Sequence, residues 1–511
     1  MPNTSGSNKR IARNTVMLYF RMLLIMAVSL YTSRIVLETL GVEDFGIYNV
    51  VGGVVAMLGF LNSAMSVATQ RFLSYEVGTG DLLQLQRVFS STVLIHCAIA
   101  FFIFVVAETV GLWFLNTCLS IPAERMGAAN WVFQCSILTF IVNILSVPYN
   151  ALIISHEEMG IYAYISIAEA ILKLSVIYLL DCFSLDKLKL YALLIFLVSL
   201  FIRMIYQFYC TRKYPECKFE FAWQKNLLKN LTSFSGWSLF GGIAQIAKVQ
   251  GVGIVLNIVW GATINAAWGI AQQVNAAVLL FVQNFVIAIN PPIIKAFAQG
   301  ERDRLFSLLF NGMKYTFFLA FCLIVPLLFE TGFVLSLWLK SVPEYTVAIV
   351  RYVLVTIMVE LFSHTIATTV QATGNIRWYQ IVVGGILFLN LPLSYVAVKM
   401  TGSPVSPMQV AVLLAGISMI FRFFILYRLV HFPLSRLLLL FCLVATLCLL
   451  SFLSAYALHC VLGQGMLRFV LITLSVLAVS VFVLAVWGTS KEERARIRLF
   501  ISHKLKSNDA R

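Results

Sequence analysis

Apolar segments long enough to cross a lipid bilayer recur along almost the whole 511-residue chain. A bilayer core about 30 Å thick needs about 20 apolar residues per helix. Hydrophobic residues make up 60% of the sequence, and charged residues make up only 12%, about half the share in an average soluble domain. A fold this apolar cannot cover its surface with polar side chains. The sequence therefore predicts an all-α membrane protein.

About fourteen transmembrane helices are expected from this pattern. We place them near residues 13–37, 45–70, 88–112, 127–153, 158–180, 188–209, 229–258, 264–290, 305–334, 345–371, 378–399, 406–428, 434–458 and 466–488. Between the first two, residues 38–44 carry acidic side chains beside Gly41. We interpret this segment as a tight turn and not as a catalytic acid pair, because no His or metal-ligand spacing accompanies the acids.

The distribution of Lys and Arg predicts the orientation of these helices, because cytoplasmic segments carry an excess of both. With the N-terminus in the cytoplasm, 23 of the 37 Lys and Arg residues are cytoplasmic and 7 lie on the opposite side. Both termini are then expected in the cytoplasm. The net charge of +15 is explained by contact with anionic membrane lipids and requires no nucleic acid. The basic tail, residues 491–511, fits the same interpretation, with a protein partner as the alternative.

Sequence motifs typical of soluble enzymes and of ATP-driven pumps are missing. The chain contains no G-x-x-x-x-G-K-[ST] phosphate loop, and the segment that begins at His156 lacks the second His of an H-E-x-x-H zinc site. The ten cysteines include no C-x-x-C pair, so we predict neither a metal site nor a cofactor. The longest loop, near 210–228, is too short to fold alone. These features favour a transporter or channel, and not an enzyme with catalytic residues.

A weak internal repeat suggests how the helices are grouped. The segment from residue 40 to 89 and the segment from 260 to 306 follow the same pattern, in which Gly46 corresponds to Gly269 and Gly80 to Gly300. Chance similarity between apolar helices is the alternative. If the repeat is real, each copy holds six helices and both have the same orientation. The predicted domains are two six-helix bundles (1–210 and 211–430), two further helices (431–490) and a basic cytoplasmic tail (491–511).

Four stretches carry a resemblance to a known family. They are "SRIVLETLGVEDFGIYNVV" (33–51), "SVATQRFLSYEVGTGD" (66–81), "SVPYNALIISHEEMGIYAYISIAEAILKLSVIYLL" (146–180) and "AINPPIIKAFAQGE" (288–301). Over most of its length the sequence resembles the polysaccharide-transporter family, which includes O-antigen flippases, within the multidrug/oligosaccharidyl-lipid/polysaccharide flippase superfamily. The resemblance implies movement of an undecaprenyl-pyrophosphate-linked oligosaccharide across a bacterial inner membrane. The multidrug and toxin extrusion branch shares this fold.

Cations outnumber acids inside the predicted helices. The cations are Arg21, Lys173, Arg203, Lys248, Lys314, Arg351 and Arg422, and the acids are Glu108, Glu169, Glu330 and Glu360. Charges at a helix centre cost about 2.5–3.5 kcal/mol each on insertion scales, so many of these cations are expected to face a wet cavity, pair with an acid or reach the interface. A cationic surplus suits a pyrophosphate, whereas an exporter of cationic drugs should show unpaired acids.

Candidate site residues follow from this surplus. Arg21 and Lys248 lie in the first helix of each repeat and are the leading candidates for substrate binding. The others are Arg351 and Lys314 for substrate binding, and Glu169 and Glu360 for ion coupling. Local pairing is the alternative role, and Lys173, four residues after Glu169, is expected to form an ion pair with it.

For Arg351 and Arg71 the sequence also predicts where the side chain lies. Arg351 precedes Glu360 by nine residues, which places the two on opposite sides of their helix. Arg71 lies near the end of a predicted span, so we expect it to contact lipid headgroups.

The sequence therefore predicts a flippase that works by alternating access, with a lipid-linked oligosaccharide and anionic lipids as its partners. Other proteins of glycan assembly are further candidate partners. A cation-coupled multidrug antiporter and a scaffold for glycan assembly are the alternatives. Neither the sugar nor the coupling ion can be read from the sequence.

Overall fold

A computed structural model describes residues 4–56, 59–118, 121–180, 185–218, 220, 224–339 and 342–488. Every regular element in these ranges is a helix, and thirteen of the helical segments are long and apolar enough to cross a membrane. The predicted class, an all-α polytopic membrane protein, is confirmed. The second expected span, 45–70, contains residues 57 and 58, which lie outside the described ranges, and it is not one of the thirteen.

The chain packs into two units. The first holds the chain up to residue 246 together with residues 283–305 and 368–385, and the second holds 247–282, 306–367 and the chain from 386 onward. The predicted domain boundaries at residues 210, 430 and 490 stay a prediction.

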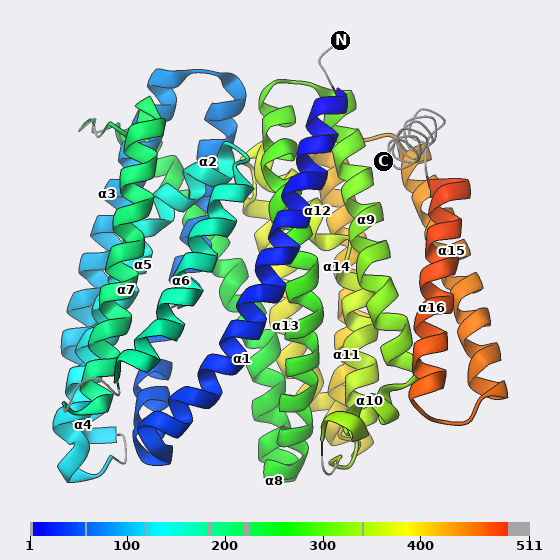
Figure 1. Ribbon diagram of the computed structural model, residues 1–511. Coiled ribbons are helices and arrows are strands. Elements are labelled where there is room, and N and C mark those ends of the chain that lie inside the picture. The colour runs from blue at the N-terminus through cyan, green and yellow to red at the C-terminus, as the bar shows by residue number, and fades with distance from the viewer. Residues whose placement is uncertain are drawn as a thin grey trace, which may run out of the picture. The chain divides into compact units, whose positions relative to one another are not determined.

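Seven α-helices of the described residues lie wholly within the first unit. They are α1 (Thr4–Ala56), α2 (Gly59–Thr79), α3 (Leu82–Val106), α4 (Leu112–Cys118), α5 (Met126–Ser155), α6 (Met159–Leu180) and α7 (Lys187–Lys213). Helix α5 packs against α2, α3 and α7, and α1 packs against α6 (Figure 1). Helix α5 is therefore the centre of this unit, and large apolar side chains such as Phe133 and Leu152 on it are fully buried.

The second unit contains the later helices. The α-helices wholly within it are α10 (Thr331–Trp338), α11 (Thr346–Glu360), α14 (Ser406–Val430), α15 (Leu434–Val461) and α16 (Met466–Val483). Helix α9 (Arg302–Phe329) belongs to it from Phe306 onward. Helices α8 (Lys225–Ala298), α12 (Ser363–Thr373) and α13 (Arg377–Thr401) contribute segments to both units. Helix α11 packs against α14, and α15 packs against α16.

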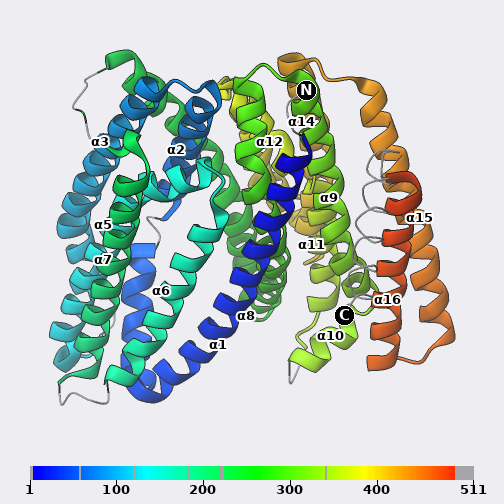
Figure 2. The ribbon, with the colours of Figure 1, turned by 45° about the horizontal axis from the view of Figure 1, so that its top comes forward.

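The expected turn at residues 38–44 is present as a sharp bend within α1. Gly41 has φ 79° and ψ 168°, in a region of backbone conformation that is open to glycine and strained for other residues. In Figure 2 the blue helix α1 turns back on itself near the bottom of the view. Gly41 thus lets the chain reverse its direction between the two helical parts of α1.

The two glycines paired by the sequence repeat have the same conformation. Gly80 follows α2 with φ 81°, and Gly300 follows α8 with φ 69°. A left-handed glycine after the last helical residue ends a helix without steric cost. Asp81 then starts α3, because its Oδ1 accepts a hydrogen bond from the backbone N–H of Gln84 at 3.0 Å. This agreement supports the repeat.

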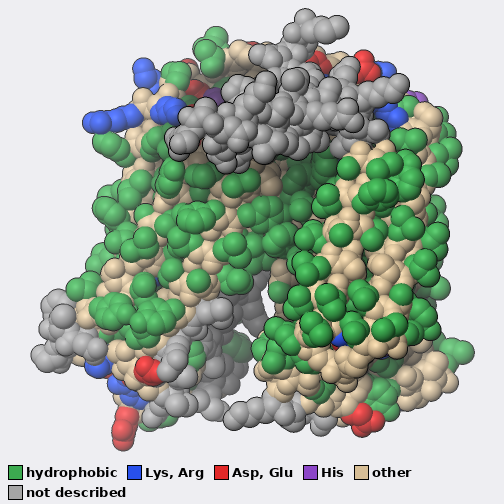
Figure 3. Space-filling view, turned by 45° about the vertical axis from the view of Figure 1, so that its right-hand side comes forward, with side chains coloured by type: hydrophobic (Ala, Val, Ile, Leu, Met, Phe, Trp, Pro, Cys, Tyr) green, Lys and Arg blue, Asp and Glu red, His purple; other side chains and the backbone are tan. Residues whose placement is uncertain are grey.

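Apolar side chains cover much of the surface of the helices. Phe101 is 70% exposed and Ile258 is 73% exposed, which suits a lipid environment and not water. Figure 3 shows hydrophobic side chains over the middle of the visible face, whereas charged side chains gather mainly near its upper and lower ends. This distribution is the one expected of a multi-pass membrane protein.

Ion pairs join residues that the sequence places on the same side of the membrane. In the first unit, Arg10 and Lys295 lie 2.6 and 2.9 Å from the carboxylate oxygens of Glu157, all three predicted to be cytoplasmic. Arg125 forms ion pairs with Asp44 and with Asp186, all three predicted to lie on the opposite side. The predicted alternation of the helices is consistent with these contacts.

Candidate functional site

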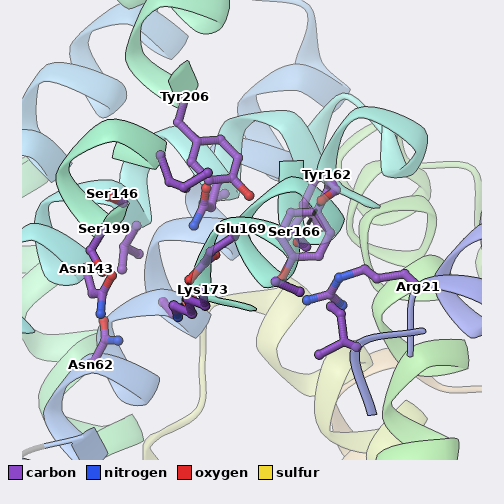
Figure 4. Close-up of a pocket in the computed structure, with 18 of the residues that line it drawn as sticks. Arg21, Asn62, Asn143, Ser146, Tyr162, Ser166, Glu169, Lys173, Ser199 and Tyr206 are labelled. Atoms are coloured by element: carbon purple, nitrogen blue, oxygen red, sulfur yellow. Dashed lines mark hydrogen bonds and ion pairs between the residues drawn. The ribbon is translucent and has the colours of Figure 1, made fainter. Parts of the chain in front are cut away.

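A polar cavity of about 610 Å³ lies inside the first unit, among helices α1, α2, α5, α6 and α7 (Figure 4). Most of its polar lining consists of hydroxyl and amide side chains. These are Ser29, Thr32, Asn62, Ser66, Gln70, Asn143, Ser146, Asn150, Ser166 and Ser199. Such groups are rare in helices that face lipid, so their convergence on one cavity marks a candidate binding site.

The polar residues of the cavity follow helical periodicity. On α5, Asn143, Ser146 and Asn150 are spaced by three and four residues, and on α2, Asn62 and Gln70 are spaced by eight. Residues at these spacings share one face of a helix. Helices α2 and α5 therefore each turn a polar stripe toward the cavity. This stripe is the signal that could have located the cavity from the sequence.

Several polar atoms of the lining are buried and make no hydrogen bond within the described part of the chain. They are Arg21 Nε, Thr32 Oγ1, Asn62 Oδ1, Gln70 Nε2 and Asn150 Oδ1. A buried polar group without a partner costs about 1–3 kcal/mol. The cavity thus offers both donors and acceptors to a hydroxyl-rich ligand or to water.

Arg21 is the cation of the cavity that has no acidic partner. Its guanidinium carbon lies 4.5 Å from the centre of the Tyr162 ring, and its Nη2 donates a hydrogen bond of 3.4 Å to the Tyr162 hydroxyl. Among the described residues, no carboxylate lies within ion-pair distance of it. The ring holds the guanidinium by a cation–π contact, and part of its hydrogen-bonding capacity is left for a ligand.

Glu169 and Lys173, also in the lining, neutralise each other. Lys173 Nζ lies 2.6 Å from Glu169 Oε1, one helical turn away on α6. The ion pair expected from their spacing is confirmed. The charged side chains of the lining therefore carry one net positive charge, which belongs to Arg21.

Lys248, the other leading candidate for substrate binding, lies in the second unit and forms an ion pair with Glu360. Lys248 Nζ lies 2.6 Å from Glu360 Oε1, and the two side chains are 11% and 26% exposed. The Glu360 carboxylate also interacts electrostatically with Arg422 and His364. Sequence reasoning could not have found this pair, because 112 residues separate its members. Substrate binding by Lys248 stays a prediction.

The remaining candidates contact backbone carbonyls in the second unit. Lys314 is 7% exposed, and its Nζ donates to the carbonyl oxygen of Gly488 at 2.7 Å. Arg351 is exposed, and its Nε donates to the carbonyl oxygen of Leu328 at 3.1 Å. Each of the two cations thus has a backbone carbonyl oxygen as a hydrogen-bond acceptor within the second unit. Roles of both residues in substrate binding stay predictions.

Solved structures with a similar arrangement of helices include two MATE transporters. A multidrug resistance MATE family transporter of the MOP superfamily, in an outward-facing conformation, matches with a TM-score of 0.72 and 12% identity over 83% of this chain and 96% of that chain. The protein has the MATE fold. The MATE transporter ClbM, in complex with Rb⁺, matches with a TM-score of 0.69 and 15% identity over 84% of this chain and 95% of that chain.

A third solved structure is similar to the same extent. It is a MOP superfamily transporter from Pyrococcus furiosus, with a TM-score of 0.69 and 12% identity over 83% of this chain and 96% of that one. It is described as having a binding pocket of reverse polarity that suggests a different function. No protein-family model and no curated protein matches the sequence. The TM-scores establish the shared fold, and identities this low leave the cargo open.

Proposed function

We propose that this protein is a transporter that moves an undecaprenyl-pyrophosphate-linked oligosaccharide across a bacterial inner membrane by alternating access. The observation that carries the proposal is the cavity of the first unit, where amide and hydroxyl groups surround one unpaired arginine, Arg21. The membrane location, with both termini in the cytoplasm, belongs to the same proposal.

The chemistry of the cavity suits a glycan that carries a phosphate. Sugar hydroxyls both donate and accept hydrogen bonds, and the buried atoms Asn62 Oδ1, Gln70 Nε2 and Asn150 Oδ1 lack partners within the described residues. The guanidinium of Arg21 can donate two parallel hydrogen bonds to a phosphate group. The lipid tail is expected to stay in the bilayer, because the cavity volume of about 610 Å³ is suited only to part of the head group.

A cation-coupled multidrug antiporter is the second candidate, and the fold of the solved MATE transporters favours it. The polarity of the cavity opposes it. A site for a cationic drug should present an acid without a partner, but Glu169, the carboxylate of the lining, is held by Lys173. The Pyrococcus furiosus transporter, described as having reverse pocket polarity, supports a change of cargo on an unchanged fold.

Ion coupling is assigned to Glu169 and Glu360 as a proposal, because ionisable residues inside membrane helices can carry protons. Each has a lysine partner, Lys173 or Lys248, at 2.6 Å. Protonation of either glutamate would release its lysine. A proton gradient would then drive transport by breaking and re-forming these ion pairs.

Complementation in a strain that lacks its O-antigen flippase tests the proposal. The wild-type chain should restore surface glycan, and Arg21→Ala should restore much less at equal abundance on a blot. Resistance to cationic drugs, measured in the same cells, should not change. Drug resistance that depends on a Na⁺ or H⁺ gradient, without glycan export, would establish the antiporter instead. Glycan assembly that requires the protein without translocation of the lipid would indicate a scaffold.

A further inference from the structure

A second cavity of the first unit, about 490 Å³ in volume, combines arginines with aromatic rings. It is formed by the end of α2, the start of α8 and the residues that join α12 to α13. The lining consists of Arg71, Phe72, Asn230, Ser233, Phe234, Trp237, Thr373, Gly374, Asn375, Ile376 and Arg377. Each contributing segment lies at the end of a membrane span, and the sequence assigns all of them to the cytoplasmic side. The cavity therefore lies where lipid headgroups are found.

Arg71 is the buried cation of this cavity. It is 8% exposed, and its Nε and Nη2 donate to the carbonyl oxygens of Gln371 and Ala372 at 3.1 and 3.2 Å. Its guanidinium also lies 4.5 Å from the Phe72 ring centre and 5.8 Å from that of Phe234. These contacts fix the orientation of the guanidinium but bring no negative charge.

No carboxylate within the described ranges forms an ion pair with Arg71. Glu76, on the same helix, interacts with it electrostatically, but its Oε2 accepts a hydrogen bond from Thr79 instead. A buried positive charge is costly without an anion beside it. Arg71 thus lacks the close anionic partner that its burial calls for.

Gly374 keeps the backbone close to this guanidinium. Its φ is 77°, and an added Cβ would lie 2.7 Å from Arg71 Nη2. Arg377, three residues later, is exposed and lies 5.6 Å from the Trp237 ring centre. Helix α13 also begins at Arg377, so the partial positive charge of its N-terminus adds to those of the two arginines.

We propose that this cavity binds a phosphate group, supplied by the headgroup of an anionic phospholipid at the membrane surface. Arg71 and Arg377 would donate hydrogen bonds to the phosphate oxygens, and Asn230, Ser233 and Asn375 would bind the polar remainder of the headgroup. Guanidinium groups suit this role because their geometry matches phosphate. The proposal does not depend on the cargo, so it stands or falls apart from the proposed function.

Isothermal titration calorimetry on the purified full-length protein in dodecyl maltoside tests this site. The ligands are dioctanoyl phosphatidylglycerol, dioctanoyl phosphatidylcholine and inorganic diphosphate. Arg377→Ala should weaken binding of phosphatidylglycerol about tenfold or more, since a charge-assisted contact is lost. Arg212→Ala is the matched control, because Arg212 is also exposed and lies over a ring, Phe208, outside the cavity. It should bind as the wild type does.

Comparison of the ligands distinguishes a lipid headgroup from a soluble anion. Binding of phosphatidylglycerol without binding of diphosphate supports the lipid headgroup. Competition between the two, lost together in Arg377→Ala, supports a phosphate site that the headgroup enters. Binding of diphosphate without binding of phosphatidylglycerol would overturn the assignment to a lipid. Arg71→Lys should lose affinity for phosphatidylglycerol, because lysine cannot donate the two parallel hydrogen bonds of a guanidinium. Its gel-filtration profile checks that the variant is folded. Equal affinities for the wild type, Arg377→Ala and folded Arg71→Lys would overturn the site.

Discussion

Lys248 Nζ and Glu360 Oε1 lie 2.6 Å apart in the second unit, although 112 residues separate them in the sequence. The two side chains are 11% and 26% exposed, so removal of one partner should cost less than the roughly 3–5 kcal/mol of a fully buried pair. Lys248→Met and Glu360→Gln should each lower the melting temperature in detergent, and the double variant should recover part of the loss. Additive losses of the two single variants would show that the pair is not coupled.

The same variants separate a structural role of Lys248 from substrate binding. If the lysine serves only to neutralise Glu360, the double variant should export glycan once its stability is restored. If Lys248 also binds the substrate, the double variant should stay inactive at wild-type abundance. Complementation measured beside the melting temperature distinguishes the two outcomes.

Glu169→Gln tests ion coupling in the first unit. The substitution removes the carboxylate that holds Lys173, so a positive charge is freed in the cavity and binding of the pyrophosphate should be kept. Stimulation of transport by a proton gradient should be lost, because glutamine cannot take up a proton. The coupling proposal loses its support if Glu169→Gln and Glu360→Gln both leave transport across a pH gradient unchanged.

Glu330 is the site of a further prediction on stability. It is fully buried, its Oε2 accepts a hydrogen bond of 2.8 Å from Arg468 Nη2, and His459 Nδ1 lies 3.1 Å from its Oε1. Arg468→Ala should lower the melting temperature, because it leaves Glu330 without its permanent cation. Lys399→Ala, an exposed cation in the same unit, is the control and should have little effect. Equal melting temperatures would show that the bridge does not hold α16 to this unit.

Acid should weaken the cluster of Arg125, Asp44 and Asp186. Partial burial alone would raise the pKa of Asp186, but hydrogen bonds from Arg125 and from the backbone N–H of Lys189 hold it below its usual value. The unfolded carboxyl has a pKa of about 3.9. The depressed pKa therefore stabilises the folded protein above about pH 4, and this contribution is lost as the pH falls further.

Arg125→Gln provides the comparison for this prediction. It should lower the melting temperature at pH 7 and should reduce the further fall below about pH 4. Identical curves for variant and wild type between pH 3 and 7 would contradict it.

Local features of this fold could be predicted from the sequence. The ion pair of Lys173 with Glu169 follows from helical spacing. The repeat paired Gly80 with Gly300, and the structure shows that both have a positive φ. Contacts between distant segments could not be predicted, because periodicity gives a helix one polar face without naming the helix it meets. The pairing of Lys248 with Glu360 and the contact of Arg71 with Gln371 are of this kind.

The candidate site was predicted only in part. Arg21 was identified because a cation inside an apolar helix is costly, and the structure places it in a polar cavity. The amides around it, such as Asn143 and Asn150, were not singled out. Such residues also occur elsewhere in the chain, and only the packing of α1, α2, α5, α6 and α7 shows which of them converge.

The central claim is that the cavity of Arg21 binds the head group of a lipid-linked oligosaccharide during transport. Proteoliposomes with a fluorescent undecaprenyl-pyrophosphate-linked oligosaccharide, quenched from outside, measure its movement between leaflets. The wild type should translocate the lipid. Arg21→Ala should be about ten- to a hundredfold slower, as expected for loss of one charge-assisted contact, and Arg21→Lys should keep much of the rate. Equal translocation by the wild type and Arg21→Ala would contradict the account.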